Sequence, residues 1–374
     1  MSLLNPRRSA GARRFSPLGL VEALVTPHGI DRYLELVNPM LTVRDLRAEV
    51  VDVRRQVVDG TGVDTRLTLR PTRQWDGFDA GQFVSVTVDI DGVRRTRCYS
   101  PANSQHRRDG LLELTVKAHP EGLVSQYLHE QARPGLVLGL SQADGTFRLT
   151  LPRPERLLLV SGGSGITPVM SMLRTLCDEG YRGGIVFLHY ALSAEHVSYL
   201  PELRQLADAH DNVRLALAYT EQQLGGDLHG LFHASHLRDV APWYANAQTY
   251  LCGPPGLMAA VRAHFDGRRL TDRLATEEFA PAPVAAPDAD VSGVTTFARS
   301  AVTSDNTGDT LLEQAENAGL SPEHGCRMGI CFSCTQVKTS GCVQNIRTGE
   351  ISSDPDTEVQ LCIHRAVGDV ALDL

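Results

Sequence analysis

The stretch that decides the fold is His-Gly-Cys-Arg-Met-Gly-Ile-Cys-Phe-Ser-Cys, residues 324 to 334. Within it Cys326, Cys331 and Cys334 have the spacing C-x4-C-x2-C, and a fourth cysteine, Cys362, follows after 27 intervening residues. Thiolates are soft anionic ligands for iron, and this spacing is the ligand pattern of plant-type [2Fe–2S] clusters. Zinc sites usually combine C-x2-C with a second such pair or with histidines, and no second pair is present. The pattern therefore predicts a [2Fe–2S] cluster on these four cysteines, with a zinc site or dispersed core cysteines as alternatives.

The ligand spacing also sets requirements on the backbone around the cluster. Three ligands within nine residues must come from a loop that wraps the cluster, and Gly325 and Gly329 allow such a loop to bend. The fourth ligand comes from further along the chain, where residues 360–363 are expected to form a strand. His324 is expected to pack or to donate a hydrogen bond rather than to bind iron.

Length and composition restrict the class of protein. The chain has 374 residues, of which 42% are hydrophobic and 21% charged, as expected for a globular protein of two to four domains. The net charge of −8 argues against nucleic-acid binding. No run of eighteen apolar residues and no signal peptide is found, and the remaining cysteines are dispersed. We expect a cytoplasmic protein without a transmembrane span, acting as a monomer.

The pattern of apolar and polar residues changes several times along the chain. Short alternating strands separated by Asp-Gly turns predict an antiparallel barrel, and the strand–helix alternation that follows predicts a parallel sheet with helices on both faces. The resulting division is an N-terminal extension (1–45), a barrel (46–151), a strand–helix domain (152–280), a Pro/Ala-rich linker (281–290) and the cysteine domain (291–374).

The N-terminal extension differs in character from the rest of the chain. It contains six arginines and four acidic residues, a net charge of +2, and its apolar residues are spaced for one or two short amphipathic helices broken near residues 27–29. Two interpretations stay open. The extension either braces the next domain or contacts a partner or a membrane surface.

Two motifs of the predicted barrel favour a flavin dinucleotide. Arg97, Tyr99 and Ser100 close a strand, where a guanidinium can bind a pyrophosphate, the phenol ring can lie against a flavin, and the hydroxyl can reach its ring nitrogens. Gly122 and Ser125 open a helix, whose N-terminus can bind an anion. A plain strand end and a plain helix cap are the alternatives. The two motifs together predict FAD.

Two motifs of the strand–helix domain favour a nicotinamide nucleotide. The turn SGGSGITP follows a compact apolar strand and carries Gly163, Gly165 and Thr167, whose backbone can approach a phosphate closely. It is not the strict G-x-G-x-x-G fingerprint. Cys252 and Gly253 end a later strand, at the edge where parallel sheets bind ligands.

Taken together, these motifs resemble the ferredoxin–NADP reductase superfamily in the layout that carries a C-terminal plant-type ferredoxin domain. The resemblance covers residue 20 to the end, and residues 36–39, 162–174 and 325–331 look most like actinobacterial reductases of membrane acyl-CoA desaturases. It implies a β-grasp, α+β fold for the cysteine domain. It also implies that the flavin and nucleotide residues named above bind their cofactors, that Ser100, Cys252 and Glu278 are catalytic, and that Phe279 contacts the flavin.

The resemblance implies electron transfer from NAD(P)H to FAD, then to the [2Fe–2S] cluster, and then to a partner protein. The implied partner is a membrane diiron fatty acyl desaturase or hydroxylase, which would place the chain at the inner face of the membrane. A soluble Rieske or diiron oxygenase is the alternative partner. A non-catalytic redox sensor or carrier is the alternative from a different class.

The choice between NADH and NADPH stays open. NADPH-selective relatives often place arginines after the second strand, but Tyr190–Ser193 contains none and Leu231 follows Gly230. A 2′-phosphate favours a cation, so the pattern leans towards NADH. Arg204 or Arg214 could compensate.

Overall fold

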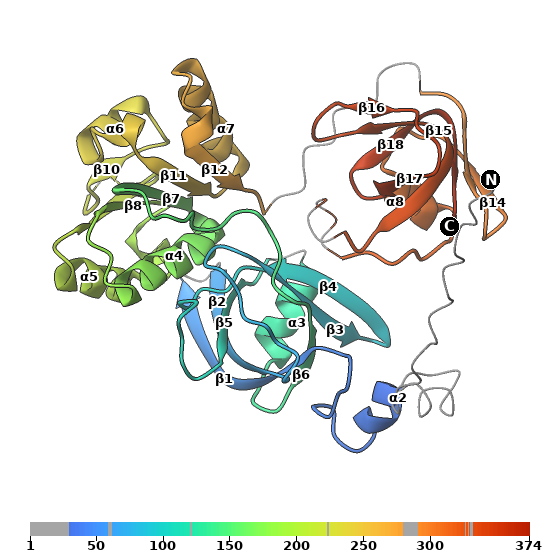
Figure 1. Ribbon diagram of the computed structural model, residues 1–374, viewed down its shortest axis with the longest axis horizontal. Helices are drawn as coiled ribbons and strands as arrows, with labels where there is room; N and C mark the ends of the chain where they lie inside the picture. Colours follow the sequence, from blue (N-terminus) through green and yellow to red (C-terminus); the bar gives the residue numbers. More distant parts are fainter. Residues whose placement is uncertain are drawn as a thin grey trace, which may run out of the picture.

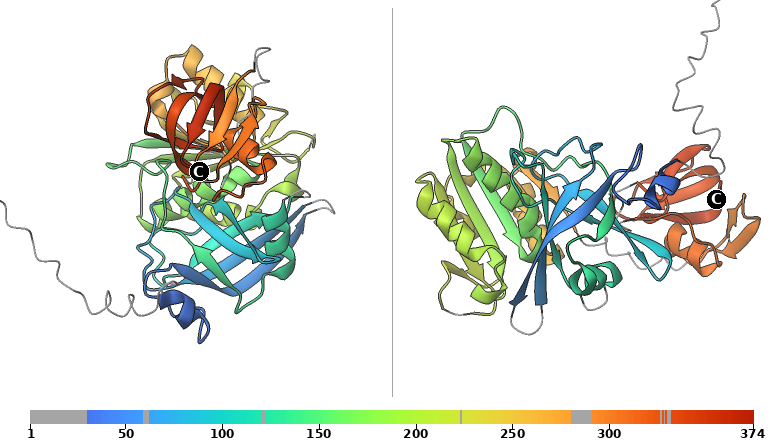
Figure 2. Two further views of the ribbon diagram at one scale, coloured as in Figure 1. Left: turned by 90° about the vertical axis from the view of Figure 1, so that its right-hand side faces the viewer. Right: turned by 90° about the horizontal axis from the view of Figure 1, so that it is seen from below.

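The computed structural model describes residues 30–58, 62–119, 122–222, 224–279, 291–325, 327, 329 and 332–374. The chain forms three units that lie side by side, with the barrel unit in the middle (Figure 1; Figure 2, right). The predicted linker at 281–290 and most of the N-terminal extension, including the predicted helix break at 27–29, lie outside the described residues.

The barrel unit is a six-stranded antiparallel sheet in the order β4-β3-β6-β1-β2-β5. Its elements are β1 (Arg47–Val58), β2 (Gly62–Pro71), β3 (Val84–Ile90), β4 (Val93–Tyr99), β5 (Leu112–Lys117), α3 (Leu123–Gln131) and β6 (Val137–Leu140). Alternate residues such as Val84 and Val86 are buried because neighbouring side chains of a strand point to opposite faces. A bridge between Pro101 and Leu114 joins the two edge strands. Before the barrel, α2 (Ile30–Glu35) is the described part of the N-terminal extension.

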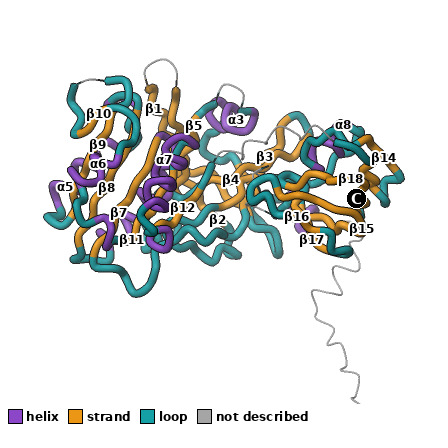
Figure 3. Tube along the Cα trace, turned by 90° about the horizontal axis from the view of Figure 1, so that it is seen from above, coloured by secondary structure: helices purple, strands orange, loops and turns teal. Residues whose placement is uncertain are grey.

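The parallel-sheet unit has six strands in the order β10-β9-β8-β7-β11-β12. Its strands are β7 (Arg156–Gly162), β8 (Gly184–Ala191), β9 (Val213–Tyr219), β10 (Leu228–His229), β11 (Gln248–Cys252) and β12 (Leu274–Glu277). Its α-helices are α4 (Ile166–Asp178), α5 (Leu200–Ala209), α6 (Ala234–Val240) and α7 (Pro255–Gly267), and its short 3₁₀ turns are η1 (Gly163–Gly165), η2 (Ala194–His196), η3 (Tyr244–Asn246) and η4 (Thr271–Arg273). α4 and α5 pack on one face of the sheet, and α6 and α7 on the other (Figure 1; helices are purple in Figure 3). The two layers bury the central strands and explain their continuous apolar runs.

The C-terminal unit is a mixed sheet with one helix packed against it. Its elements are β13 (Val294–Phe297), β14 (Val302–Asp305), α8 (Leu311–Asn317), β15 (Thr335–Asn345), β16 (Ile351–Ser352), β17 (Thr357–Gln360) and β18 (His364–Leu372). The strand order is β14-β13-β18-β15-β16, with β17 paired to β15 and with β13 and β18 parallel. A capping box between Thr310 and Glu313 begins α8.

These three architectures confirm the predicted fold class. One local expectation is wrong: Cys362 does not lie on a strand. Residues 361–363 form a turn between β17 and β18, in which Ile363 N donates to Gln360 O at 3.2 Å. In the described part of the chain, no helix has the length and apolar character needed to cross a membrane.

The cores show how the units are coupled. One hydrophobic cluster contains Ala102 and Phe147 beside the barrel together with Leu159, Met172 and Leu203 of the parallel-sheet unit. The core of the C-terminal unit, in contrast, is built from its own residues between 297 and 374. The barrel strands also enclose a core of their own, and it is the loops that follow β4 and β6 that share a hydrophobic cluster with the parallel sheet. Among the described residues, the core of the C-terminal unit shares no member with either.

Candidate active site

Two predicted nucleotide-binding turns meet at the carboxyl edge of the parallel sheet. β7 and β11 are neighbours, with Ser161 opposite Cys252. A Cβ built on Gly165 would lie 2.3 Å from the carbonyl oxygen of Cys252 and 2.7 Å from Gly253 N. Glycine at position 165 is therefore required for this approach of the two turns. Gly163 has a φ of +51°, and the Thr167 hydroxyl donates to Ser164 O at 3.3 Å in the first turn of α4.

A buried polar pair lies where the barrel meets the parallel sheet. Ser100, which follows β4, donates from Oγ to Oε2 of Glu277 at 3.4 Å. Glu277 ends β12 directly beside Cys252 of β11. Burial raises the pKa of Glu277 to about 8, so this carboxyl group is protonated at neutral pH. Burial raises the pKa of the Cys252 thiol, which stays protonated.

Pattern-based reasoning missed Glu277 and named its neighbour Glu278 instead. The carboxylate of Glu278 forms an ion pair with Arg262 and lies 3.6 Å from the guanidinium of Arg347 in the C-terminal unit. Alternation along β12 turns consecutive side chains to opposite faces, which sends Glu277 to Ser100 and its neighbour elsewhere. Phe279 packs against the core shared by the first two units. The role assigned to Glu278 stays a prediction.

The predicted flavin strand touches the predicted cluster loop. Arg97 Nη1 donates to its own neighbour Thr96 O at 2.7 Å and to Gly325 O at 3.2 Å. Gly325 directly precedes Cys326 in the chain. The same strand carries Tyr99, which packs against the barrel core. One hydrogen bond thus connects the flavin strand with the peptide next to a predicted iron ligand.

The predicted phosphate-binding turn before α3 has an internal hydrogen-bond network. Ser125 Oγ donates to Gly122 O at 2.9 Å and accepts from His119 N at 3.2 Å. A Cβ on Gly122 would lie 2.3 Å from Ser125 Oγ. The small residue at position 122 therefore keeps the N-terminal end of α3 open around the hydroxyl.

The described residues bring two of the four predicted ligands near each other, Cys334 at the end of the cluster loop and Cys362 in the turn between β17 and β18. Cys334 and Cys362 are both buried, and Leu361 N donates to Cys334 O at 3.1 Å. Gly329 N donates to Cys362 Sγ at 3.3 Å, with Gly329 at a φ of +73°. Cys326 and Cys331 lie outside the described residues, so their placement as ligands stays a prediction.

An ion pair fixes the loop to the helix beneath it. Arg327, with a φ of +57°, donates from Nη1 to Glu316 on α8 at 3.0 Å and from Nη2 to a second oxygen of the same carboxylate. Arg327 Nη2 also lies 3.0 Å from His324 Nε2, and His324 Nδ1 lies 3.1 Å from Pro322 O. His324 therefore takes part in hydrogen bonding at the base of the loop, as predicted.

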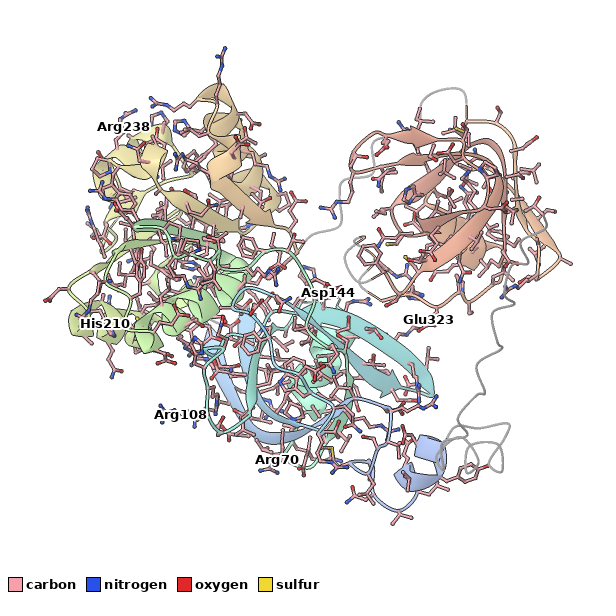
Figure 4. All side chains as sticks on the ribbon, viewed as in Figure 1. Arg70, Arg108, Asp144, His210, Arg238 and Glu323 are labelled. Carbon is pink, nitrogen blue, oxygen red and sulfur yellow. The ribbon has the colours of Figure 1, made fainter. Side chains whose placement is uncertain are left out.

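A cavity of about 640 Å³ separates the edge of β4 from the loop that leads into the cluster, and it is lined by Arg95, Glu323 and His324 among others. A second cavity, of about 420 Å³, lies between Asp144 and Glu323, which face each other across the two units in Figure 4.

The residues fit the cofactors that the sequence predicts. Arg95 Nε is buried without a hydrogen-bond partner, and alternation along β4 places Arg95 on the same side as Arg97 and Tyr99. A half-buried cation with a free buried donor, beside a predicted pyrophosphate ligand, suits FAD. Buried thiols approached by a backbone N–H suit a [2Fe–2S] cluster, whose sulfur atoms accept such hydrogen bonds.

The two arginines considered as ligands of a 2′-phosphate lie at different edges of the parallel sheet. Arg214 is at the amino end of β9 and donates to Val240 O at 2.9 Å, on the edge opposite to the nucleotide turns. Arg204, on α5, is close enough to Tyr219 at the carboxyl end of β9 to affect its pKa. Of these two, Arg204 is the candidate that lies near the ligand edge.

Family models match all three units. Residues 56–160 match an oxidoreductase FAD-binding domain, residues 159–263 an oxidoreductase NAD-binding domain, and residues 296–366 a 2Fe-2S iron-sulfur cluster binding domain. These matches assign FAD, NAD(P)H and a [2Fe–2S] cluster to the three units described above.

Known proteins show the same layout. An NADPH oxidoreductase of Mycobacterium tuberculosis is 36% identical over 94% of this chain and 90% of its own length. The glycine betaine monooxygenase reductase subunit of Pseudomonas aeruginosa is 30% identical over 79% of this chain and 87% of its own length. The crystal structure of phthalate dioxygenase reductase matches 88% of this chain and 98% of its own with a TM-score of 0.58, and at 23% identity it supports the fold.

Proposed function

The chain belongs to the ferredoxin reductase family of NAD(P)H-dependent oxidoreductases that carry FAD and a C-terminal [2Fe–2S] domain, and from this premise we propose that it is the reductase component of a soluble multicomponent oxygenase. NAD(P)H gives up a hydride, that is two electrons and one proton, and leaves as NAD(P)⁺. FAD held by the barrel unit would supply the acceptor for this pair, and a [2Fe–2S] cluster on Cys326, Cys331, Cys334 and Cys362 would supply one-electron transfer to the oxygenase.

The observation that carries this proposal is the contact between Arg97 and Gly325. It brings the cluster loop to β4, the strand that precedes Ser100, next to the nucleotide edge of the parallel sheet. The segment near Ser100, where electrons enter from the nucleotide, and the loop at Gly325, from which they leave, are therefore neighbours. The relative named as a glycine betaine monooxygenase reductase subunit supports an oxygenase as the acceptor.

Anaerobic titration with NADH and with NADPH, followed by visible absorption, tests the proposal. We expect the better nucleotide to bleach the flavin bands and the cluster bands together, and the reduced protein to be reoxidised by a purified Rieske or diiron oxygenase component. Bleaching of the flavin without the cluster would contradict the proposed relay. Full reduction without transfer to any soluble oxygenase would contradict the proposed acceptor.

A membrane-bound diiron desaturase or hydroxylase is the second candidate acceptor, favoured by the N-terminal segment. Asp31 accepts hydrogen bonds from the backbone N–H groups of residues 43–45 at 2.6 to 2.8 Å. These hydrogen bonds hold residues 31 to 45 together, while Leu36 and Val37 stay 82% and 80% exposed. Apolar side chains held outward on a segment adjoining an arginine-rich terminus would suit a membrane surface on the cytoplasmic side.

The double variant Leu36→Ser/Val37→Ser separates the two acceptors. If the segment binds a membrane, the variant should bind anionic lipid vesicles more weakly and should transfer electrons more slowly to a vesicle-embedded diiron acceptor. The reason is that each serine removes apolar area that would be buried in the lipid. Leu151→Ser is the matched control, since Leu151 is also 80% exposed but lies outside the segment. Equal vesicle binding by the wild type and the double variant would remove this candidate.

A further inference from the structure

Partly buried charges interact across the boundary between the barrel and the parallel sheet. Arg174 on α4 donates to both carboxylate oxygens of Glu202 on α5 at 2.7 and 2.6 Å. Its Nη1 donates across the boundary, to Ala102 O at 2.7 Å and to Oε1 of Glu113 on β5 at 2.8 Å. The Arg174 side chain is 14% exposed, so these bonds are shielded from water. A single guanidinium therefore joins two helices to two segments of the barrel unit.

Tyr199 lies beside Arg174 and crosses the same boundary. It is fully buried, and its hydroxyl hydrogen-bonds to Thr115 of β5. The guanidinium carbon of Arg66, on β2, lies 3.9 Å from the ring centroid, and that of Arg174 lies 5.1 Å from it. Tyr199 has a φ of +64°, a conformation that is costly for a bulky residue and persists where the surroundings enforce it. Arg174 and Tyr199 are referred to below as the clamp.

The clamp is attached to both halves of the active site. On one side, α4 begins directly after Gly165 of the nucleotide turn, and a helix is stiff over the nine residues from Ile166 to Arg174. On the other side, Ala102 follows Ser100 by two residues. Ser171 Oγ on α4 reinforces the link by donating to Asn103 O at 2.7 Å. A shift of α4 relative to the barrel would therefore change the distance between the nucleotide turn and Ser100.

We propose that Arg174 and Tyr199 are positioning residues for hydride transfer, which fix the nucleotide turn relative to the flavin strand across the domain boundary. Transfer requires the reacting atoms to approach within about 3 to 3.5 Å, and a misplacement of about 1 Å can lower the rate by about 10²-fold. Neither residue belongs to the turns that bind the nucleotide, so the clamp is expected to govern the rate of transfer more than nucleotide affinity. The inference uses the reductase activity of the family and is independent of which protein accepts the electrons.

Arg174→Gln and Tyr199→Phe test the clamp, with Arg153→Gln as the matched control. Arg153 also binds a carboxylate through two nitrogens, on Glu179 at 3.0 and 2.7 Å, and its side chain is also 14% exposed. Its other hydrogen bond, to Thr150 O, stays within the approach to β7. The control therefore removes an equivalent ion pair while leaving the clamp in place.

Anaerobic stopped-flow reduction of the FAD-loaded protein gives the limiting rate and the nucleotide Kd separately. For Arg174→Gln we expect the limiting rate to fall by about 10- to 100-fold with a Kd within about threefold of wild type, because the misplacement acts on transfer. The deuterium isotope effect with nucleotide labelled at C4 should rise as transfer becomes rate-limiting. Arg153→Gln should keep the wild-type rate and isotope effect.

Amide hydrogen exchange of the nucleotide-free protein supplies a readout independent of activity. Peptides covering 100–105 and 162–167 should exchange faster in Arg174→Gln than in wild type, because the clamp restrains both segments. In Arg153→Gln their exchange rates should equal those of wild type. A wild-type limiting rate in FAD-loaded Arg174→Gln would overturn the proposal, as would an equal loss in Arg153→Gln. If Arg174→Gln fails to retain FAD, Tyr199→Phe decides, since it removes a single hydroxyl: a several-fold lower limiting rate supports the clamp, and a wild-type rate overturns it.

Discussion

Gly329→Ala is expected to remove the [2Fe–2S] cluster, and with it electron delivery to one-electron acceptors. A Cβ at this position would lie 2.6 Å from Cδ1 of Ile363, in the turn that carries Cys362. A φ of +73° adds about 1–2 kcal/mol of strain for a residue with a side chain. The loop and the turn would have to separate, and the hydrogen bond from Gly329 N to Cys362 Sγ would be lost.

Iron and acid-labile sulfide per chain, together with the visible spectrum, measure the effect. Cluster content and cytochrome c reduction should fall by about 10- to 100-fold, as expected when support of a metal ligand is lost. Ferricyanide reduction, which takes electrons from the flavin, should persist. Full cluster content in Gly329→Ala would show that the loop tolerates a side chain here.

The chain offers a matched control and a compensating change. Gly319 has a φ of +84°, but a Cβ there would meet nothing within 4 Å. Gly319→Ala therefore introduces the backbone strain without the overlap, and its cluster content should equal that of wild type. Adding Ile363→Ala to Gly329→Ala should restore part of the cluster, because it removes the atoms that the new Cβ meets.

Glu277→Ala is expected to lower the limiting rate of flavin reduction by about 10²-fold, the loss expected when a side chain that positions the reacting groups is removed and they shift by about 1 Å. The substitution removes the carboxyl group that accepts from Ser100 beside Cys252. Glu278→Gln should change this rate far less, because its carboxylate pairs with Arg262 and Arg347 instead. Stopped-flow reduction of both variants shows which of the two glutamates supports flavin reduction. A larger loss of rate in Glu278→Gln than in Glu277→Ala would assign this role to Glu278.

The raised pKa of Glu277 also predicts a pH dependence of stability. Between its ordinary pKa of 4.5 and the folded-state value of about 8, the folded protein holds a proton that the unfolded chain has released. Stability contributed by this group is therefore present below pH 4.5 and is lost as pH rises towards 8. Glu277→Gln, which stays neutral, should flatten the fall in the urea midpoint between pH 6 and pH 8. An identical slope in wild type and variant would contradict the raised pKa.

Much of the fold was predictable because the patterns are local. Alternating strands with Asp-Gly turns predicted the antiparallel unit, and the strand–helix alternation predicted the parallel one, since each pattern has a period fixed by backbone geometry. The spacing of cysteines predicted the cluster domain, because ligands close in sequence are close in space. The same reasoning placed Gly163, Gly165 and Cys252 at the ends of adjacent parallel strands, where the structure has them, and their contacts with the nucleotide stay predictions.

The features that were missed depend on tertiary packing. Glu277 and Glu278 are indistinguishable in sequence, and it is the pairing of β12 with β11 that turns the first towards Ser100. Residues 361–363 have apolar character that suits a strand, yet they turn so that Cys362 faces the loop at Gly329. Arg174 looks like an ordinary helix residue until the barrel is packed against α4.

The separate core of the C-terminal unit has an evolutionary consequence. A domain that packs against its neighbours through the polar contacts of Arg97 and Arg347, and not through their hydrophobic core, can be replaced without redesigning the interior of the others. The barrel has a core of its own, but loop residues such as Ala102 and Phe147 fill part of the interior of the parallel-sheet unit, which ties these two units more closely together. Recombination at the segment between residues 279 and 291 could therefore give one reductase body new acceptors, while its nucleotide chemistry is inherited as one block.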